Sequence, residues 1–592
     1  MHRNRTWTLD PPEWRTQRNR LLPIEGGDGS TLNLDFTTGI LDPRLTFNRL
    51  STATFVNSSG YVEYAGANLL PNSATLQGTG WNIGGNGVGG TVTVTNISAT
   101  NPENGETCTR LVFGVAAAGG SPRLYYTTTA INPYTMFVWM RSNTPATNYT
   151  ISLYRNDTWA DFPVTPTWTR FQITRTSGTG LPGYFMLANN STSVQPDILV
   201  WGAQLNPGST AQTYYPTTTA AYHAPRFDYS PTNIGQPRGL LVEGQTANIA
   251  TNSNALASAG GLTRTYPTGV ISPDGTENAQ RFTKSDATTP RYIYPTTLFT
   301  VPASTAYTAS IWIKYDGYAF TTQIQSDTAM DWGGAWTAAF VIATGGITVG
   351  SRTGICSAST VTAYPNGWYR CTATITTGAA PTGANPRFLI DVVGTTGVSV
   401  LVYGLQLEAG SGASSYIPTG ASQVTRTADH CTIPTASFIP GNPYPQTLFV
   451  DCIPNTPSGA FLDIVRVFDR TVGGTFSYGT EIYYYTASTM TVSRKIAAST
   501  NTERSFASGL AYGTRHKFAL SIDASSYSGS YDGVTALGVA TAPTALATVA
   551  THLGIGCSGD SSPNAVMFGT IRQIKFYPTA LSQTQINTLT AL

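Results

Sequence analysis

One stretch of the chain occurs twice, and it constrains the fold more than any other feature. Residues 199–217 read LVWGAQLNPGSTAQTYYPT and residues 401–419 read LVYGLQLEAGSGASSYIPT, with more than half of the aligned positions identical. Both copies alternate as a β-strand with one buried face does, and Pro, Gly and Ser then end the strand. The predicted faces are Leu199, Trp201, Ala203 and Leu205 against Val200, Gly202, Gln204 and Asn206, and Leu401, Tyr403, Leu405 and Leu407 against Val402, Gly404, Gln406 and Glu408.

Further motif pairs precede each copy in the same order. WTRF at 168–171 matches WYRC at 368–371, YTMFVW at 134–139 matches YTASIW at 307–312, and NLLPNS at 68–73 matches NIATNS at 248–253. Each copy holds short strand-like runs between turn signals, the pattern of a β-sandwich or jelly roll. We predict two homologous jelly-roll modules, residues 68–219 and 248–430. Their order of motifs resembles carbohydrate-binding modules of the jelly-roll type.

The composition also favours strands. The 592 residues include 59 Gly and 36 Pro with abundant Thr and Tyr, and such sequences suit short strands and tight turns. We predict an all-β, multidomain protein. A net charge of +2 gives no electrostatic footprint for nucleic acid, and no apolar run approaches the ~18 residues of a membrane helix. We therefore expect no nucleic-acid binding and no membrane insertion.

Residues 431–592 form a third predicted unit. In RHKFALSIDASSYSGSYDGV (515–534), Phe518, Leu520 and Ile522 alternate with polar residues, and Asp532 with Gly533 suits a hairpin turn. The chain closes on GTIRQIKFYPTALSQTQINTLTAL, where Ser582 and Gln585 suit the cap of a short helix. This layout resembles the concanavalin A-like (laminin-G-like) sandwich, which implies a lectin-like domain.

Three further motifs surround these units: 34–68 (LDFTTGILDPRLTFNRLSTATFVNSSGYVEYAGAN), 224–231 (APRFDYSP) and 238–249 (RGLLVEGQTANI). They resemble the signature of bacteriophage virion fibre proteins. We expect residues 31–67 and 220–247 to form a β frame, with the first module inserted between its halves. The resemblance implies a virion protein on the outer surface of the head or tail, a homotrimer, and attachment to host-surface glycan.

Residues 1–30 are predicted to be an arm that anchors the protein on portal, tail or head proteins of the particle. A basic disordered tail is the alternative. The tryptophans would fill pockets and the arginines would pair with carboxylates. The anchor residues are Trp7, Trp14, Arg15, Arg18 and Arg20.

A sugar site needs an aromatic plate beside planar polar groups. We assign Trp139, Trp168, Trp201, Trp312 and Trp368, which recur in both modules, to the cores. The candidate sugar contacts lie where the copies diverge, and core packing of Trp159 and Trp336 is the alternative. These candidates are Arg155, Asp157, Trp159 and Asp161 in the first module, and Asp331, Trp332 and Trp336 in the second.

Consecutive tyrosines mark the third unit. Because Tyr483, Tyr484 and Tyr485 follow one another, a strand there must direct tyrosine outward. With Tyr531 beside the hairpin, Tyr483 and Tyr485 are candidates for a glycan groove or, equally, for a subunit interface. Gln204 and Gln406 recur too, and either hydrogen-bond in a second buried layer or line a ligand face.

We expect no enzyme. Among only 31 acidic residues, those near aromatics are single, whereas a glycosidase needs two carboxylates ~5–10 Å apart. No cofactor is expected; structural calcium is an implication of the fold families alone. Six scattered cysteines suit cores better than disulfides. The alternative is a disulfide between Cys356 and Cys371, if their strands are neighbours. The rival functions are a purely structural head or tail decoration and, less favoured, a polysaccharide depolymerase.

Overall fold

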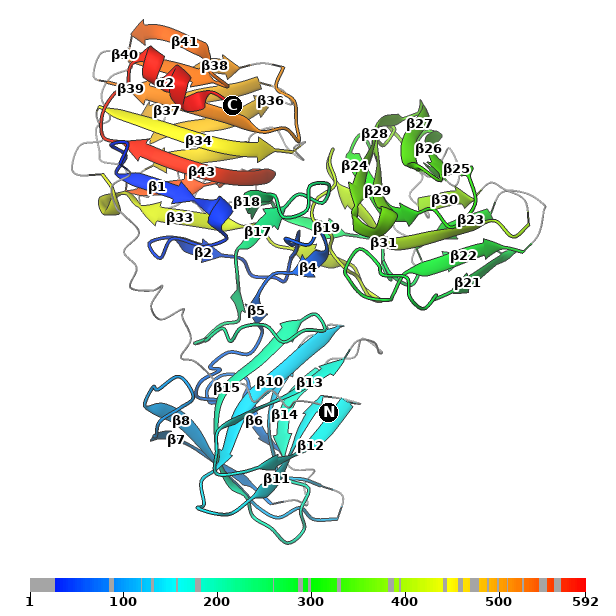
Figure 1. Cartoon of the computed structure of the whole chain (residues 1–592), viewed down its shortest axis with the longest axis vertical. Helices are drawn as coiled ribbons and strands as arrows, with labels where there is room; N and C mark the ends of the chain where they lie inside the picture. The colour runs from blue at the N-terminus through cyan, green and yellow to red at the C-terminus, as the bar shows by residue number, and fades with distance from the viewer. Residues whose placement is uncertain are drawn as a thin grey trace, which may run out of the picture.

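The computed structural model is built almost entirely of antiparallel strands, which confirms the all-β prediction (Figure 1). It describes residues 27–592 apart from 85–89, 119, 129–132, 156–157, 176–182, 259, 286–290, 296–299, 327–331, 382–387, 393–395, 440–444, 456–461, 469–478, 487–488, 498–499, 508, 524–525, 542–550 and 558–565. Within these residues the chain forms three β-sandwiches around a central junction. Residues 1–26 of the predicted arm lie outside the described residues.

Residues 68–219, module 1, form a jelly roll. The described strands make two five-stranded sheets in the orders β13-β10-β15-β8-β7 and β12-β11-β14-β9-β6, so consecutive strands cross between the sheets as in a jelly roll. The core between the sheets includes Phe113, Met136 and Phe185. The strands are β6 (Trp81–Gly84), β7 (Val92–Ser98), β8 (Thr107–Phe113), β9 (Arg123–Thr128), β10 (Tyr134–Ser142), β11 (Tyr149–Arg155), β12 (Thr158–Val164), β13 (Thr169–Arg175), β14 (Gly183–Ala188) and β15 (Asp197–Pro207).

Residues 248–426, module 2, repeat this topology with one addition, while residues 427–430 belong to the C-terminal sandwich. The sheet orders are β21-β22-β31-β24-β29-β28 and β20-β23-β30-β25-β26-β27. The consecutive strands β27 and β28 are additional, and each extends one of the two sheets. The elements are β20 (Ala257–Ser258), β21 (Leu262–Thr265), β22 (Gln280–Lys284), β23 (Arg291–Tyr294), β24 (Ala306–Lys314), β25 (Phe320–Ser326), β26 (Trp336–Ala343), β27 (Gly346–Gly354), β28 (Cys356–Tyr364), η2 (Pro365–Gly367), β29 (Trp368–Thr376), β30 (Phe388–Val392) and β31 (Ser399–Ala409).

The third sandwich corrects the predicted division of the chain. The frame does not form a unit of its own, because its strands pair with the C-terminal strands: Leu34 stands opposite Ile574, and Leu241 opposite Thr570. Residues 27–66, 224–245 and 427–592 thus build one sandwich, the C-terminal sandwich, and both modules are insertions into it (Figure 1).

The C-terminal sandwich ends as the sequence predicts. Asp532 and Gly533 form a two-residue turn between β40 and β41, both with positive φ, and Ser582 with Gln585 makes the capping box of α2. Its elements are β1 (Leu32–Asp35), η1 (Phe36–Thr38), β2 (Thr46–Asn48), β17 (Arg226–Tyr229), β18 (Pro237–Val242), β33 (His430–Pro434), η3 (Thr435–Ser437), β34 (Gln446–Pro454), β35 (Leu462–Phe468), β36 (Gly479–Thr486), β37 (Thr489–Ala497), β38 (Thr500–Ala507), β39 (His516–Ile522), β40 (Ser526–Tyr531), β41 (Val534–Thr541), β42 (His552–Ile555), β43 (Gly569–Tyr577) and α2 (Gln583–Thr590).

The doubled strand, β15 and β31, is buried on both faces, so the prediction of one buried face is wrong. A β-bulge sets Gly202 and Ala203 opposite the single residue Val138, and the bulge shifts the alternation. Leu199 and Trp201 therefore pack on the outer side, whereas Ala203 and Leu205 face the core between the sheets. Module 2 repeats the bulge at Gly404.

The repeated tryptophans follow the core prediction to different extents. Trp201, Trp312 and Trp368 are buried. Trp139 and Trp168 are half-buried and pack against the cluster that contains Trp201. Gln204 and Gln406 are fully buried, and each accepts a hydrogen bond at 2.7 Å from a backbone N–H of the loop that covers the strand. The second buried layer is thus confirmed. All six cysteines are free, so Cys356 and Cys371 do not pair.

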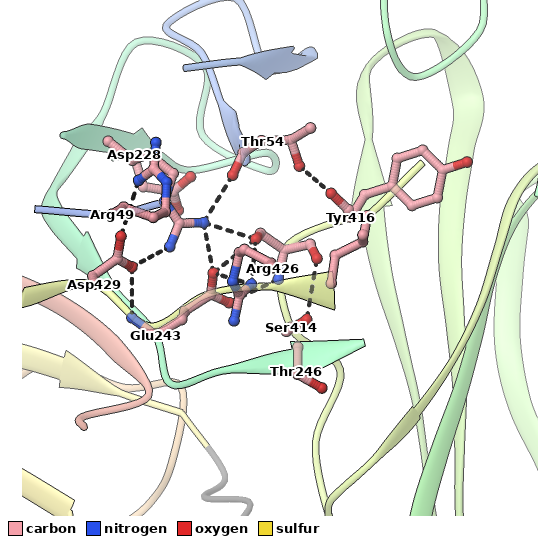
Figure 2. Close-up of polar contacts among 12 residues, drawn as sticks. Arg49, Thr54, Asp228, Glu243, Thr246, Ser414, Tyr416, Arg426 and Asp429 are labelled. Atoms are coloured by element: carbon pink, nitrogen blue, oxygen red, sulfur yellow. Dashed lines mark hydrogen bonds and ion pairs between the residues drawn. The ribbon is translucent and has the colours of Figure 1, made fainter. Parts of the chain in front are cut away.

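A network of buried charges joins module 2 to the C-terminal sandwich at the junction (Figure 2). Arg226 of β17 pairs with Glu243 at 2.6 Å and with Asp429, and Arg426 also pairs with Glu243 at 2.6 Å. Arg49 pairs with Asp429 at 2.9 Å. Burial alone would raise the pKa of Glu243, but the guanidinium groups of Arg426 and Arg226 outweigh it and lower that pKa to about 2.

Short strand pairs complete the junction. The hairpin of β3 and β4 packs on module 2, where Val62 N donates to Pro273 O at 2.8 Å and Thr54 Oγ1 donates to Tyr416 O at 2.5 Å. Module 1 joins through β5 and β16, with Gln212 Oε1 accepting from Ala67 N at 3.0 Å. These strands are β3 (Thr54–Val56), β4 (Val62–Tyr64), β5 (Ala67–Asn68), β16 (Tyr222–His223), β19 (Thr246–Asn248) and β32 (Val424–Arg426).

Candidate functional site

One outer face of module 1 gathers aromatic and planar polar side chains. In the sheet β12-β11-β14-β9-β6, Leu124, Phe185 and Leu153 pack into the core, so the residues that alternate with them lie on the outer face. We call this surface the tyrosine face. Its residues are Asn82, Arg123, Tyr125, Ser152, Tyr154, Asp161, Tyr184, Met186 and Ala188.

Strand register aligns three aromatic residues and one methionine in a row across four strands. Tyr125 of β9 stands opposite Met186 of β14, Met186 stands opposite Tyr154 of β11, and Tyr154 stands opposite Trp159 of β12. Directly opposite residues on one face have Cβ atoms about 4.5–5.5 Å apart, close enough to form a continuous surface.

Tyr125, at one end of the row, contacts Tyr184 of the neighbouring strand β14. The ring centroids of Tyr125 and Tyr184 are 5.5 Å apart with the planes at 86°, an edge-to-face pair, and Tyr184 is 39 % exposed. The Arg123 guanidinium lies over the Tyr125 ring, with Cζ 5.9 Å from the centroid. The pair fixes the orientation of an aromatic surface that faces solvent.

A chain of hydrogen bonds runs beside this aromatic row. Ser121 Oγ donates to Asn190 Oδ1 at 2.6 Å, Asn190 Nδ2 donates to Ser152 Oγ at 2.7 Å, and Ser152 Oγ donates to Asp161 Oδ1. Each side chain in this chain holds the next in place. Asp161 and Asn190 are exposed, so the chain presents an amide and a carboxylate in fixed positions.

Flat aromatic rings next to oriented amide and carboxylate groups are chemically suited to a sugar ring. The rings can pack on its apolar C–H face while the polar chain hydrogen-bonds its hydroxyl groups. Among the described residues of the tyrosine face, Asp161 is the one carboxylate.

The matching face of module 2 has different chemistry. There Tyr292 of β23 and Gln323 of β25 occupy the row, and Ala339 of β26 stands opposite Gln323. Thus a glutamine and an alanine take the positions that Tyr154 and Trp159 hold in module 1. The two modules share a fold but not this surface.

The first group of predicted sugar contacts is partly placed on the tyrosine face. Asp161 lies on it, and the register sets Trp159 opposite Tyr154. Arg155 ends β11, and its side chain, like that of Trp159, is outside the described part of the structure. Asp157 also lies outside the described residues.

The second group of predicted sugar contacts needs a correction. The indoles of Trp332 and Trp336 are 0 % and 2 % exposed, and they contact each other edge to face at 5.7 Å inside the module 2 core. Neither presents a ring to a ligand, because both fill the space between the two sheets. The core alternative is therefore the right one for Trp336, and Asp331 lies outside the described residues.

The tyrosine candidates of the third unit are separated by the structure. Tyr483 and Tyr485 lie on β36, with their side chains outside the described part, and Tyr531 ends β40, half-buried against the core. β36 and β40 belong to different sheets, so the structure does not gather these three residues into one groove. The anchor residues Trp7, Trp14, Arg15, Arg18 and Arg20 lie outside the described residues.

Sequence reasoning missed Tyr125, Tyr154 and Tyr184. Tyr125 and Tyr126 are adjacent in RLYYTT, so a strand must place one ring on each face, the same logic that singled out the later tyrosine run. Tyr126 packs against the core and Tyr125 lies on the tyrosine face. Tyr184 carries the same signal through its neighbour Phe185, whereas Tyr154 has no adjacent aromatic residue and joins the face only when β11 pairs with β14.

In the described residues, no group of three or more His, Cys, Asp and Glu side chains is arranged to hold a metal ion. No described helix combines the length and apolar character needed to span a membrane.

Comparison with known proteins gives distant structural similarity only. Neither a model of a known protein family nor a curated protein sequence matches the chain. The CBM40 of Ruminococcus gnavus IT-sialidase, bound to alpha2,3 sialyllactose, is 13% identical, with 25% of this chain and 83% of that chain covered at a TM-score of 0.23.

Two other similar structures hold two domains each. The CBM22-1-CBM22-2 tandem of Paenibacillus barcinonensis Xyn10C is 14% identical, covering 58% of this chain and 98% of that chain at a TM-score of 0.18. Domains LG4-5 of the mouse laminin alpha1 chain are 11% identical, covering 48% and 89% at a TM-score of 0.17. At these scores the similarities fix neither a ligand nor a role for this chain.

Proposed function

We propose that this chain is a bacteriophage virion fibre protein that binds host-surface glycan through the tyrosine face of module 1. The observation that carries the glycan part is the fixed Tyr125–Tyr184 pair beside the chain of hydrogen bonds that ends at Asp161. The frame motifs support the virion part, because they resemble those of fibre proteins. In this proposal residues 1–30 dock on portal, tail or head proteins, and the protein acts on the outer surface of the particle.

The proposed mode of action is binding without catalysis, amplified by valency. An open sheet face holds a glycan by a few ring contacts and hydrogen bonds, so a single site is weak. A homotrimer would display three copies of the tyrosine face, and linked weak sites gain avidity through raised effective concentration. The protein needs no cofactor for this role.

Polysaccharide binding by the full-length chain tests the proposal. The probe is an array of bacterial surface polysaccharides, read with wild type and with the double variant Tyr125→Ala/Tyr184→Ala. We expect wild type to bind a subset of the polysaccharides and the double variant to lose that signal. The matched control is Tyr292→Ala on β23, the strand of module 2 that corresponds to β9 of module 1; it should bind as wild type does.

Two results would contradict the proposal. If wild type binds none of the polysaccharides, the receptor role fails and a structural decoration of the particle becomes the better account. If the double variant binds as wild type does, the glycan site lies elsewhere. Release of reducing ends from a bound polysaccharide would contradict binding without catalysis and favour a depolymerase.

A further inference from the structure

A cleft large enough for a small ligand lies at the junction, apart from the tyrosine face. It is a cleft of about 480 Å³ between the β3–β4 hairpin, module 2 and the C-terminal sandwich. Small-molecule sites occupy ~300–1,000 Å³ and are common at domain interfaces. We call it the junction cleft; the residues that matter here are Asp228, Arg238, Thr362, Tyr364, Arg370 and Thr372.

The junction cleft is built around an element that the chain contains twice. In module 2 the Arg370 guanidinium stacks on the Trp312 ring, with Cζ 4.6 Å from the centroid. In module 1 the corresponding Arg170 lies over Trp139 at 5.7 Å. The two copies differ in their cover, because Trp312 is fully buried whereas Trp139 is half-buried and Arg170 is exposed.

The cover in module 2 comes from parts that module 1 lacks. Strand β28 places Tyr364 edge-on against Trp312, with centroids 5.5 Å apart. On the other side, Val62 of the frame hairpin packs into the same aromatic cluster. An open platform in one module thus becomes a walled cleft in the other.

One wall of the junction cleft carries hydroxyl groups. Thr360 and Thr362 on β28 and Thr372 and Thr374 on β29 all line it, and the Oγ1 atoms of Thr360 and Thr372 are 2.6 Å apart. Asn455 and Tyr512 also line the cleft. Closely spaced hydroxyls together with an aromatic ring suit a polyhydroxylated ring better than an apolar ligand.

The charged residues that line the cleft differ in whether they already have an ion-pair partner. Arg370 donates to two neutral acceptors, Ser414 O at 2.8 Å and Ser310 Oγ at 2.9 Å. Arg238 makes no close ion pair with a carboxylate among the described residues, although its charge acts on Asp228. Glu243 also lines the cleft, but its charge is held between Arg226 and Arg426. Asp228 is the remaining carboxyl, and its Oδ1 accepts from Val56 N at 2.7 Å.

We propose that the junction cleft binds a carboxylated sugar, as a monosaccharide or the acidic end of a short saccharide. The two arginines would attract the carboxylate, since Arg pairs well with planar anions. The threonine wall would bind the ring hydroxyls. This site is separate from the tyrosine face and does not depend on the proposed function.

The test uses the full-length protein and ligand-observed NMR titration with three probes: glucuronate, glucose and acetate. We expect saturable binding of glucuronate in the millimolar range, and at least tenfold weaker binding of both glucose, which lacks the carboxylate, and acetate, which lacks the hydroxyls. Arg238→Gln should weaken glucuronate binding at least tenfold. Asp228→Asn keeps the acceptor atom but removes a negative charge, and should strengthen it.

Two controls locate the site. Arg170→Gln removes the matching arginine of the open platform in module 1, and Tyr125→Ala/Tyr184→Ala removes the tyrosine pair; both should bind glucuronate as wild type does. Circular dichroism of each variant checks that the fold is kept. The proposal is overturned if glucuronate does not bind, if glucose or acetate binds equally well, or if folded Arg238→Gln binds unchanged.

Discussion

The guanidinium of Arg49 lies 2.9 Å from the carboxylate of Asp429, and both side chains are fully buried although the residues are far apart in the sequence. Asp429 also accepts from Arg226, so this one carboxylate holds two frame arginines next to the end of module 2. A buried pair gives little net stability over apolar packing, but losing one partner leaves an uncompensated charge. The position of module 2 on the C-terminal sandwich therefore depends on a complete set of charges.

Asp429→Asn should be strongly destabilising. It leaves Arg49 and Arg226 buried without their carboxylate, at a cost of about 3–5 kcal/mol. Chemical denaturation followed by tryptophan fluorescence measures the change. The matched control is Asp197→Asn, which breaks the part-exposed pair with Arg110 and should cost about 0–1 kcal/mol. Equal effects of the two substitutions would contradict the role given to the junction.

Glu243 predicts a loss of stability in acid. Its pKa is about 2 in the fold against an ordinary 4.5, so the folded protein binds this proton less readily than the unfolded chain. The stabilisation is complete above the unfolded pKa and is lost as the pH falls from 4.5 toward 2. Thermal unfolding across this window should show a decline that Glu243→Gln makes shallower. The same slope in wild type and variant would refute the assignment.

The pKa of Asp228 predicts the opposite pH dependence of stability. Burial raises its pKa to about 6 from 3.8, so here the folded protein holds the proton more tightly than the unfolded chain. Its contribution favours the fold at low pH and is lost as the pH rises through about 6. Asp228→Asn should therefore raise the unfolding temperature at neutral pH and have little effect near pH 4. A variant less stable than wild type at neutral pH would contradict this.

Gly202 should tolerate no side chain. Its φ is +66°, and a Cβ would lie 2.8 Å from Cε3 of Trp139. Gly202→Ala adds overpacking of about 1–3 kcal/mol to the backbone strain. Gly208→Ala is the control in the same module, because its φ is also positive but the added atom meets only Tyr64 at 3.8 Å. Denaturation midpoints should fall further for Gly202→Ala; equal losses would argue against close packing at the bulge.

The fold was predictable where the signal is local or duplicated. The repeat identified two jelly-roll modules, and the Asp532-Gly533 turn and the Ser582 cap are short motifs with their own geometry. The frame strands were harder, because Leu34 pairs with Ile574 at the opposite end of the chain and no local pattern reports that pairing. The bulge at Gly202 was also not predicted. The alternation of side chains looks regular in the sequence, and only pairing with β10 shows the shift.

The candidate site was less predictable than the fold. Divergence between the modules pointed to β12, and the structure places Asp161 of that strand on the tyrosine face. The same reasoning chose Trp332 and Trp336, which diverge because the second core fills its space differently. Sequence difference alone does not separate a changed surface from a repacked interior. Tyr125 and Tyr184 meet only through sheet pairing.

The most direct test of the glycan-binding account is calorimetric titration of the full-length protein with a surface polysaccharide that it binds. The account predicts that Tyr125→Ala/Tyr184→Ala weakens binding at least tenfold while Tyr292→Ala leaves it unchanged, with all three proteins equally folded. An affinity of the double variant equal to that of wild type would contradict it.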